Sequence, residues 1–456
     1  MTTDTAALEN RSKRYKAVWR WHFYAGLMVI PVLMLLTISG LGMLIAKPID
    51  DALNQHLLVI EAQEKRLADS VLLGNVKEHY QHDMVTLYIP AQVENASAVF
   101  SLKPAHAQGH GGHNPESLLV YVNPYTGKIL GDRASSDSWY NTVKTLHGSI
   151  YLGDTGDLII EITAGFAVLL IVTGLYLAWP GQGWQTLLPP RRLKSRADWR
   201  QLHRTIGWFI AIPLFFFLMS GLAWTNIWGG KFVQPWNSVI GTNYNASEVT
   251  HSSLNDQGAH RVPWALEQTA LPQSHGDLNK LTLDDVTKFA QEHGFKGFRV
   301  HLPQGHHSVW TISATTMAGD ITNPLGDNIV HLEPSNGQVL ANISFSDYSA
   351  IGKAMAAFIP FHEGNLGLWN WLLNIVLVVI IFMLMVSGLV MWFKRQRQKS
   401  FSVNAPKAAK QQGRNVILIM CLLSLCFPMT AAALLCIILI DWLITARLVF
   451  WNSVIK

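Results

Sequence analysis

The chain has 456 residues, of which 49% are hydrophobic and only 14% are charged, and its formal net charge is +5. So high a share of apolar side chains exceeds what one soluble core requires, and it excludes an ordinary soluble protein. Lys and Arg are concentrated beside apolar segments, so the basic excess reports membrane topology and does not indicate a nucleic-acid partner.

Four apolar segments are each long enough to cross a bilayer, which takes about 20 residues of helix. They are residues 23–46, 158–179, 206–227 and 368–393. The first is too long for the core of a signal peptide and is expected to stay as an anchor. A fifth apolar region, residues 416–455, contains Pro428, Asp441 and Arg447. It predicts either one kinked span or a short hairpin, so whether it crosses the membrane once or twice stays open.

Basic residues mark the cytoplasmic side of the predicted spans. Residues 11–20, 191–204 and 394–414 are rich in Lys and Arg. Short basic loops of this kind lie in the cytoplasm, so we expect a multi-pass protein of a bacterial inner membrane. Residues 47–156 and 228–361 would then be periplasmic. They contain no cysteine, so no disulfide is expected there.

The chain contains an internal repeat. His22 and His203 begin the first and third spans and are followed at equal offsets by Gly26 and Gly207, and then by Ser39-Gly40 and Ser220-Gly221. His147 and His362 precede the second and fourth spans, which contain Thr173-Gly174 and Ser387-Gly388. Each half is thus a span, an external domain and a returning span, and a pseudo-twofold axis along the membrane normal is expected to relate the halves.

The external segments repeat as well. "LLVYVNPYTGKILG" (118–131) and "NIVHLEPSNGQVLA" (328–341) both predict a hairpin around a Pro-x-x-Gly turn. "LTLDDVTKFAQEHGF" (281–295) predicts a helix with Thr282 or Asp284 as its N-cap and Gly294 as its stop. A small α+β module is therefore expected in each half.

The predicted fold is a mostly α membrane protein. It has a pseudo-twofold four-helix transmembrane core, two periplasmic α+β insertions and an extra C-terminal membrane segment. The expected boundaries are 1–46, 47–156, 157–227, 228–361, 362–397 and 398–456. In order, these hold the first span, the first periplasmic domain, the second and third spans, the second periplasmic domain, the fourth span, and a basic linker with the C-terminal segment.

The four repeated histidines fall at two depths. His22 and His203 lie at the cytoplasmic ends of their spans, and His147 and His362 lie near the outer ends. Zinc requires three or four protein ligands, whereas a b-type haem needs only two axial nitrogens from the protein. Two bis-histidine haems are therefore one prediction from the residues, with Gly26 and Gly207 leaving space for a flat macrocycle. The alternative for a histidine at a membrane boundary is an interfacial anchor or a capping residue. Ser39-Gly40 and Ser220-Gly221 are interpreted as helix-packing contacts.

Five motifs in order resemble the PepSY-associated transmembrane family over nearly the whole chain. They are "RWHFYAG...SG", "VNPYTGKILG", "TLHGSIYLGDTGD", "WRQLHRTIGW...SG" and "PFHEGNLG". The resemblance implies PepSY-like external domains and two haem b groups held by His22, His147, His203 and His362. It also implies reduction of ferric siderophore iron to Fe(II) in the periplasm.

Several features stay open at this point. His106, His110 and His113 form an external loop that could capture a metal or be only polar and mobile, and His301, His306 and His307 read as a strand entering a turn. The chain lacks a GxGxxG or GxxxxGK[ST] motif, so electrons would come from a quinol or a partner reductase. The alternatives are a non-redox PepSY binding or regulatory protein, and a siderophore or metal permease.

Overall fold

The structure is a computed structural model that describes residues 2–105, 117–179, 183–240, 242–255, 262–274, 280–305, 307–396 and 418–454. The chain divides into two compact units. The helical unit comprises residues 1–41, 145–233 and 374–456, and the sheet unit comprises residues 42–144 and 234–373.

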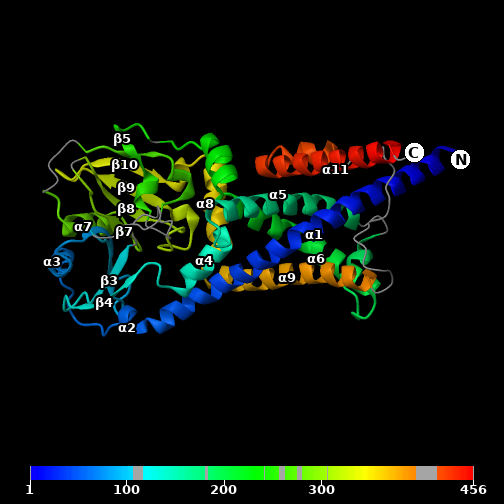
Figure 1. Cartoon of the computed structure of the whole chain (residues 1–456). Coiled ribbons are helices and arrows are strands. Elements are labelled where there is room, and N and C mark those ends of the chain that lie inside the picture. The colour runs from blue at the N-terminus through cyan, green and yellow to red at the C-terminus, as the bar shows by residue number, and fades with distance from the viewer. Residues whose placement is uncertain are drawn as a thin grey trace. The chain divides into compact units, whose positions relative to one another are not determined.

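The helical unit is built from long helices that run side by side (Figure 1). They are α1 (Thr2–Leu53), α5 (Gly153–Ala178), α6 (Arg196–Leu222), α9 (Leu368–Gln396) and α11 (Pro428–Val454). In the described part of the chain, four helices are long and apolar enough to cross a membrane: Lys13–Leu53, Gly153–Ala178, Arg196–Leu222 and Leu368–Arg395. The four predicted spans are therefore confirmed as helices.

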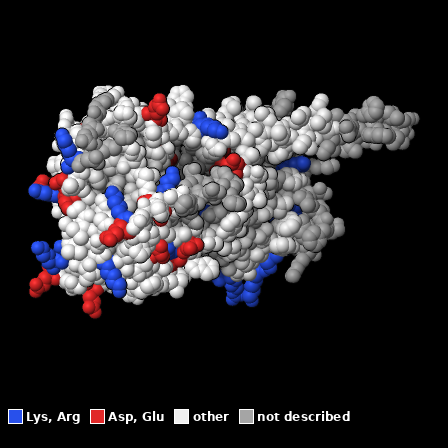
Figure 2. Space-filling view, turned by 60° about the vertical axis from the view of Figure 1, so that its left-hand side comes forward, with Lys and Arg blue, Asp and Glu red and all other residues white. Residues whose placement is uncertain are grey.

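The exposed side chains of these helices are those of a lipid-facing surface. Figure 2 shows charged side chains spread over the sheet unit, whereas few appear along the visible flank of the long helices. On α6, Phe209 and Ile212 are 69% and 68% exposed. A water-facing helix of this length would leave a large apolar patch in solvent, so these residues favour contact with lipid.

The third span differs from its predicted bounds at both ends. It begins earlier because Ser195 and Asp198 form a capping box that starts α6 at Arg196. It ends at Leu222 rather than at residue 227, and a wider helical segment, η2 (Asn226–Val233), follows. Carboxylates of α5 hold the start of η2, since Asp157 accepts from the N–H of Asn226 and Glu161 accepts from the N–H of Trp228.

In the described part of the C-terminal region, two helical segments are separated by residues 425–427. Residues 418–424 are helical, and α11 begins afresh at Pro428 because proline is tolerated in the first turn of a helix. The start of α11 packs closely on α5. A Cβ at Gly165 would lie only 1.9 Å from Oγ1 of Thr430, so this glycine permits the contact. Whether this region crosses the membrane once or twice stays a prediction.

The sheet unit contains one eight-stranded antiparallel sheet in the order β10-β9-β8-β7-β1-β2-β3-β4. Its strands are β1 (Met84–Ile89), β2 (Ala98–Lys103), β3 (Leu118–Val122), β4 (Ile129–Ala134), β7 (Arg299–His301), β8 (Trp310–Ala314), β9 (Asn328–Leu332) and β10 (Val339–Ser344). A separate pair joins β5 (Ala246–Thr250) to β6 (Ala270–Pro272). The helices of this unit are α2 (Gln55–Leu58), α3 (Asp69–His79), α4 (Trp139–Ser149, which continues into the helical unit), α7 (Leu283–Glu292) and α8 (Ala350–Glu363).

The two predicted modules share this sheet. Strand β1 of the first module pairs with β7 of the second, through Leu87 opposite His301 and Tyr88 opposite Val300. A single hydrophobic core runs beneath both modules, with Leu72 of α3 and Val286 of α7 buried against strands from each half. The expectation of a separate module in each half is therefore corrected to one continuous sheet with a shared core.

The local predictions within the modules are confirmed. Both Pro-x-x-Gly hairpins form, as β3–β4 and β9–β10, and their turn glycines Gly127 and Gly337 have φ of 70° and 74°. Helix α7 begins after Thr282, whose hydroxyl accepts from the N–H of Asp285, and it stops before Gly294 at φ 81°. Only glycine adopts such left-handed angles without strain, which fixes these turns.

Candidate functional site

Two of the repeated histidines face each other inside the helical unit. The ring centroids of His22 on α1 and His203 on α6 are 6.4 Å apart, and the rings are nearly perpendicular at 81°. An imidazole nitrogen lies about 2 Å from a metal that it ligates, so two rings sharing one ion from opposite sides have centres about 6 Å apart. The separation of His22 and His203 fits that arrangement.

In both imidazoles, Nδ1 is hydrogen-bonded to a hydroxyl group on another helix. Nδ1 of His22 lies 2.9 Å from Oγ1 of Thr173 on α5. Nδ1 of His203 lies 2.8 Å from Oγ of Ser387 on α9, and also 3.1 Å from the carbonyl oxygen of Leu384. Each hydrogen bond orients its ring and leaves Nε2 as the remaining ring nitrogen.

His147 is held in the same way. It lies near the end of α4, and its Nδ1 is 3.0 Å from Oγ of Ser39 on α1. A Cβ at Gly40 would lie 3.3 Å from Cε1 of this ring. Ser39 and Gly40 of α1 therefore contact the side chain of another helix, which agrees with their interpretation as a helix-packing contact, and that side chain is an imidazole.

The glycines that contact the imidazoles are not Gly26 and Gly207, the two that were predicted to leave space for a macrocycle. A Cβ at Gly174 would lie 3.1 Å from Cε1 of His22, and one at Gly388 would lie 3.7 Å from Cε1 of His203. Beside Gly26 and Gly207 the nearest side chains to a Cβ would be Leu170 at 4.0 Å and Leu384 at 3.6 Å. The role of Gly26 and Gly207 in leaving space for a macrocycle stays a prediction.

His362 lies near the end of α8, in the sheet unit. Helix α8 ends at Glu363, and Gly364 caps it in the left-handed conformation, at φ 80°. His147 belongs to the helical unit and His362 to the sheet unit, so their pairing on a second haem stays a prediction.

The donor set around His22 and His203 fits a haem better than a bare metal ion. Among the described residues, no group of three or more His, Cys, Asp or Glu side chains could hold a metal. Zinc would lack its third and fourth ligands, whereas a porphyrin supplies four nitrogens of its own. The two imidazoles therefore fit a haem, which needs only two ligands from the protein.

The sheet unit contains a second pair of histidines, and these two rings are hydrogen-bonded directly to each other. His251 and His331 are fully buried, and their Nε2 atoms are 3.0 Å apart. Nδ1 of His251 donates to the carbonyl of Thr269 at 2.7 Å, so its Nε2 accepts from His331. Nδ1 of His331 then accepts from the hydroxyl of Thr311 at 2.9 Å. Both rings are neutral, and the hydrogen bond between them leaves no space for an ion.

This buried pair predicts loss of stability in acid. Burial lowers the pKa of His251 from 6.5 to about 4, so the unfolded chain takes up a proton below pH 6.5 that the folded chain does not. The contribution of neutral His251 to the free energy of unfolding is therefore complete above pH 6.5. It decreases by about 1.4 kcal/mol per pH unit as the pH drops toward 4. His251→Asn, which keeps a donor for Thr269, should be less stable than the parent at pH 7, and the gap should close by about 3 kcal/mol near pH 4.

Thermal unfolding of the full chain in detergent, measured from pH 7 to pH 4, checks this prediction. Asp327 acts in the opposite direction, because burial raises its pKa to about 7 and the folded state binds its proton first. The comparison between parent and variant cancels that contribution. Parallel stability profiles for the two proteins would contradict the assignment.

The remaining histidines do not form a described site. His106, His110, His113 and His306 lie outside the described residues. His301 ends strand β7 and is buried, as the predicted strand requires. Nδ1 of His307 donates to the carbonyl of Ser274 at 3.2 Å, so this ring ties two loops together.

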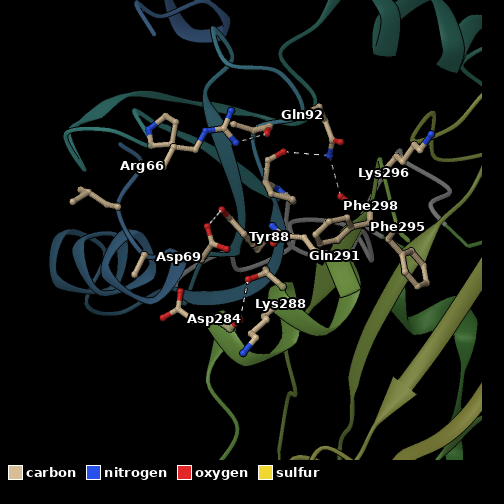
Figure 3. A pocket seen from close by; sticks show the side chains of 16 residues that line it. Arg66, Asp69, Tyr88, Gln92, Asp284, Lys288, Gln291, Phe295, Lys296 and Phe298 are labelled. Carbon is tan, nitrogen blue, oxygen red and sulfur yellow. Dashed lines mark hydrogen bonds between the residues drawn. The ribbon is translucent and has the colours of Figure 1, made fainter. Parts of the chain in front are cut away.

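The sheet unit also contains a polar pocket of about 330 Å³ between α3 and α7 (Figure 3). Asp69 of α3 accepts from the buried hydroxyl of Tyr88, and burial raises the pKa of the Asp69 carboxyl. Asp284 of α7 accepts from the N–H and hydroxyl of Ser70. Arg66, whose guanidinium donates to the carbonyls of Ala91 and Val93, closes one side. None of the predicted site residues lines this pocket.

Comparison with known proteins agrees with the motifs. No curated protein matches the chain. A model of the PepSY-associated TM region family matches residues 19–395, which include His22, His147, His203, His362 and both halves of the sheet. This match covers more than half of the 456 residues, and the chain belongs to the PepSY-associated TM region family.

Proposed function

We propose that this protein is an inner-membrane di-haem b oxidoreductase that passes electrons across the bilayer and reduces ferric siderophore iron in the periplasm. The observation that carries the proposal is the pair His22–His203, whose ring centroids are 6.4 Å apart without a third metal ligand among the described residues. Both residues lie on apolar helices of spanning length, where an ionisable side chain is costly unless it serves a function.

The residues divide into those that bind and those that orient. His22 and His203 would hold one haem through their imidazoles, and His147 and His362 would hold the other. A haem bound there would supply one-electron chemistry that needs no proton, which suits transfer through a region that excludes water. Thr173, Ser387 and Ser39 hold the imidazoles at Nδ1, and so keep their orientation fixed when the charge of the site changes.

The family resemblance supports ferric siderophore as the substrate. Reduction adds one electron to chelated Fe(III) and gives Fe(II), for which oxygen-rich chelators have less affinity. The electron would come from a quinol in the bilayer or from a partner reductase, because the sequence has no nucleotide-binding loop of its own.

Visible spectroscopy of the purified full chain tests the haem. Protein from haem-replete cells should show reduced-minus-oxidised bands of low-spin bis-histidine haem, with two haems per chain. A colourless preparation would overturn the proposal and leave the non-redox binding protein and the permease.

Substrate reduction is tested separately in proteoliposomes. The haems are reduced anaerobically with a quinol analogue, and a ferric siderophore is then added outside. Reoxidation of the haem bands, together with capture of Fe(II) by a chromogenic chelator, is expected. Haem that stays reduced in the presence of every ferric chelate tested would overturn the assigned reaction.

A further inference from the structure

Three imidazoles share one contact that the sequence did not predict. Each ring places its Nδ1 on a Ser or Thr hydroxyl and its Cε1 over the glycine that follows, on a neighbouring helix. We infer that Thr173-Gly174, Ser387-Gly388 and Ser39-Gly40 are positioning pairs that set the tautomer and the orientation of His22, His203 and His147. For its consequences on haem, this inference rests on the proposed function; the tautomer itself does not.

The proton positions follow from the hydrogen bonds of the hydroxyls. Each hydroxyl also lies close to a carbonyl oxygen of its own helix: Thr173 to Leu169 at 2.8 Å, Ser39 to Leu35 at 2.8 Å and Ser387 to Leu384 at 2.6 Å. A hydroxyl has one proton, and a carbonyl can only accept, so that proton is donated to the carbonyl. The hydroxyl oxygen must then accept from the imidazole, and Nδ1 carries the ring proton.

His203 supports this assignment independently. Its Nδ1 lies 3.1 Å from the carbonyl oxygen of Leu384, which cannot donate. Nδ1 of His203 is therefore protonated whichever way the Ser387 hydroxyl turns. In a neutral imidazole with Nδ1–H, the lone pair is on Nε2, which is the form that binds a metal.

The glycines set how closely each ring approaches the helix. A Cβ would lie 3.1 Å from the ring at Gly174, 3.3 Å at Gly40 and 3.7 Å at Gly388. Two carbon atoms 3.1 Å apart are closer than van der Waals contact allows, whereas 3.7 Å is an ordinary van der Waals distance. Alanine at position 174 should therefore displace its imidazole, and alanine at position 388 should be tolerated.

Packing alone would not produce this contact three times. Ser and Thr often bond to the carbonyl of residue i−4 in membrane helices, and small residues let helices approach. Thr205 on α6 is such a case, since its hydroxyl donates to the carbonyl of Gln201 at 2.9 Å. It is a buried threonine in a spanning helix whose hydrogen bonds go to carbonyl oxygens, and it supplies a matched control.

Nitrogen NMR of the full chain, labelled with 15N-histidine and prepared without haem in detergent, tests the tautomer. The His22 signal is assigned by its loss in His22→Gln. In the parent it should have the shifts of the Nδ1–H form. Thr173→Val should move it toward the Nε2–H form, whereas Thr173→Ser and Thr205→Val should leave it unchanged. Unchanged shifts in Thr173→Val would overturn the inference, whether or not the protein binds haem.

The haem-loaded protein gives a second test. Losing the acceptor at Nδ1 makes an imidazole a weaker ligand for ferric iron, so Thr173→Val should raise the reduction potential of one haem and weaken its retention by about 10-fold. Ser387→Ala should have a smaller effect, because the Leu384 carbonyl still accepts from His203. Equal shifts in Thr173→Val and Thr205→Val would overturn the positioning role. A parent protein without haem would overturn the proposed function only, and the nitrogen shifts would still decide the inference.

Discussion

Replacing His203 with alanine is expected to lower the haem content of the purified protein from two haems per chain to one. The reason is that His22 and His203 face each other at a ring separation of 6.4 Å, and an iron held by one imidazole exchanges far more readily than one held by two. The remaining haem should keep its low-spin spectrum. Transfer of electrons across the membrane of proteoliposomes should stop, because the one haem that remains is too far from one membrane face to exchange electrons there.

The experiment compares the two single variants of the His22–His203 pair with the double variant. His22→Ala should remove the same haem as His203→Ala, so the double variant should lose no more haem than either single one. The control is His293→Ala, since His293 is an exposed imidazole whose Nδ1 donates to the carbonyl of Phe289 one turn earlier. Pyridine haemochrome assays give the count. Two full haems in His203→Ala, or additive losses in the double variant, would show that His22 and His203 do not share an iron.

Replacing Arg299 with alanine is expected to destabilise the sheet unit by about 3–5 kcal/mol. Arg299 on β7 donates to Oδ1 of Asp320 through Nη2 at 2.6 Å and Nε at 2.9 Å, and also to the carbonyl of Ala318. The two charged side chains are only 8% and 3% exposed. Alanine at 299 leaves the Asp320 carboxylate buried without its counter-charge, which costs more than the ion pair itself contributes.

A double-mutant cycle separates these two effects. Asp320→Ala should cost a similar amount, and the double variant Arg299→Ala/Asp320→Ala should cost less than the two single changes combined. The exposed pair Lys288–Glu292, at 3.8 Å and with exposures of 73% and 60%, is the control, and Lys288→Ala should cost less than about 1 kcal/mol. Denaturation followed by tryptophan fluorescence measures all four variants. A small effect for Arg299→Ala, equal to that of Lys288→Ala, would contradict the prediction.

Local patterns predicted much of the fold because their physical causes are local. About 20 apolar residues specify a span wherever they occur, and a Pro-x-x-Gly turn between alternating strands specifies a hairpin. The β1–β7 pairing was not predicted, because Tyr88 and Val300 meet across more than 200 positions of sequence without a turn signal between them. The end of the third span at Leu222 was also missed, since hydropathy continues through the break.

The candidate site was predicted in part. The equal offsets of the repeat identified His22 and His203 as equivalent, and the structure brings their rings together. Thr173 was only a marker of the repeat, although it lies 151 positions from His22 and holds its Nδ1. The recurrence of a hydroxyl followed by glycine in all four spans was the available signal, but only coordinates show which imidazole each hydroxyl contacts.

The shared sheet has a consequence for how this chain can be divided. Strands β1 and β7 each have a neighbour on both sides only while the two halves are together. If the two halves were expressed as separate chains, β1 in one and β7 in the other would be unpaired edge strands. Unpaired edge strands associate with other chains. Keeping both halves in one chain pairs these two edges within a single molecule, which protects them from intermolecular association.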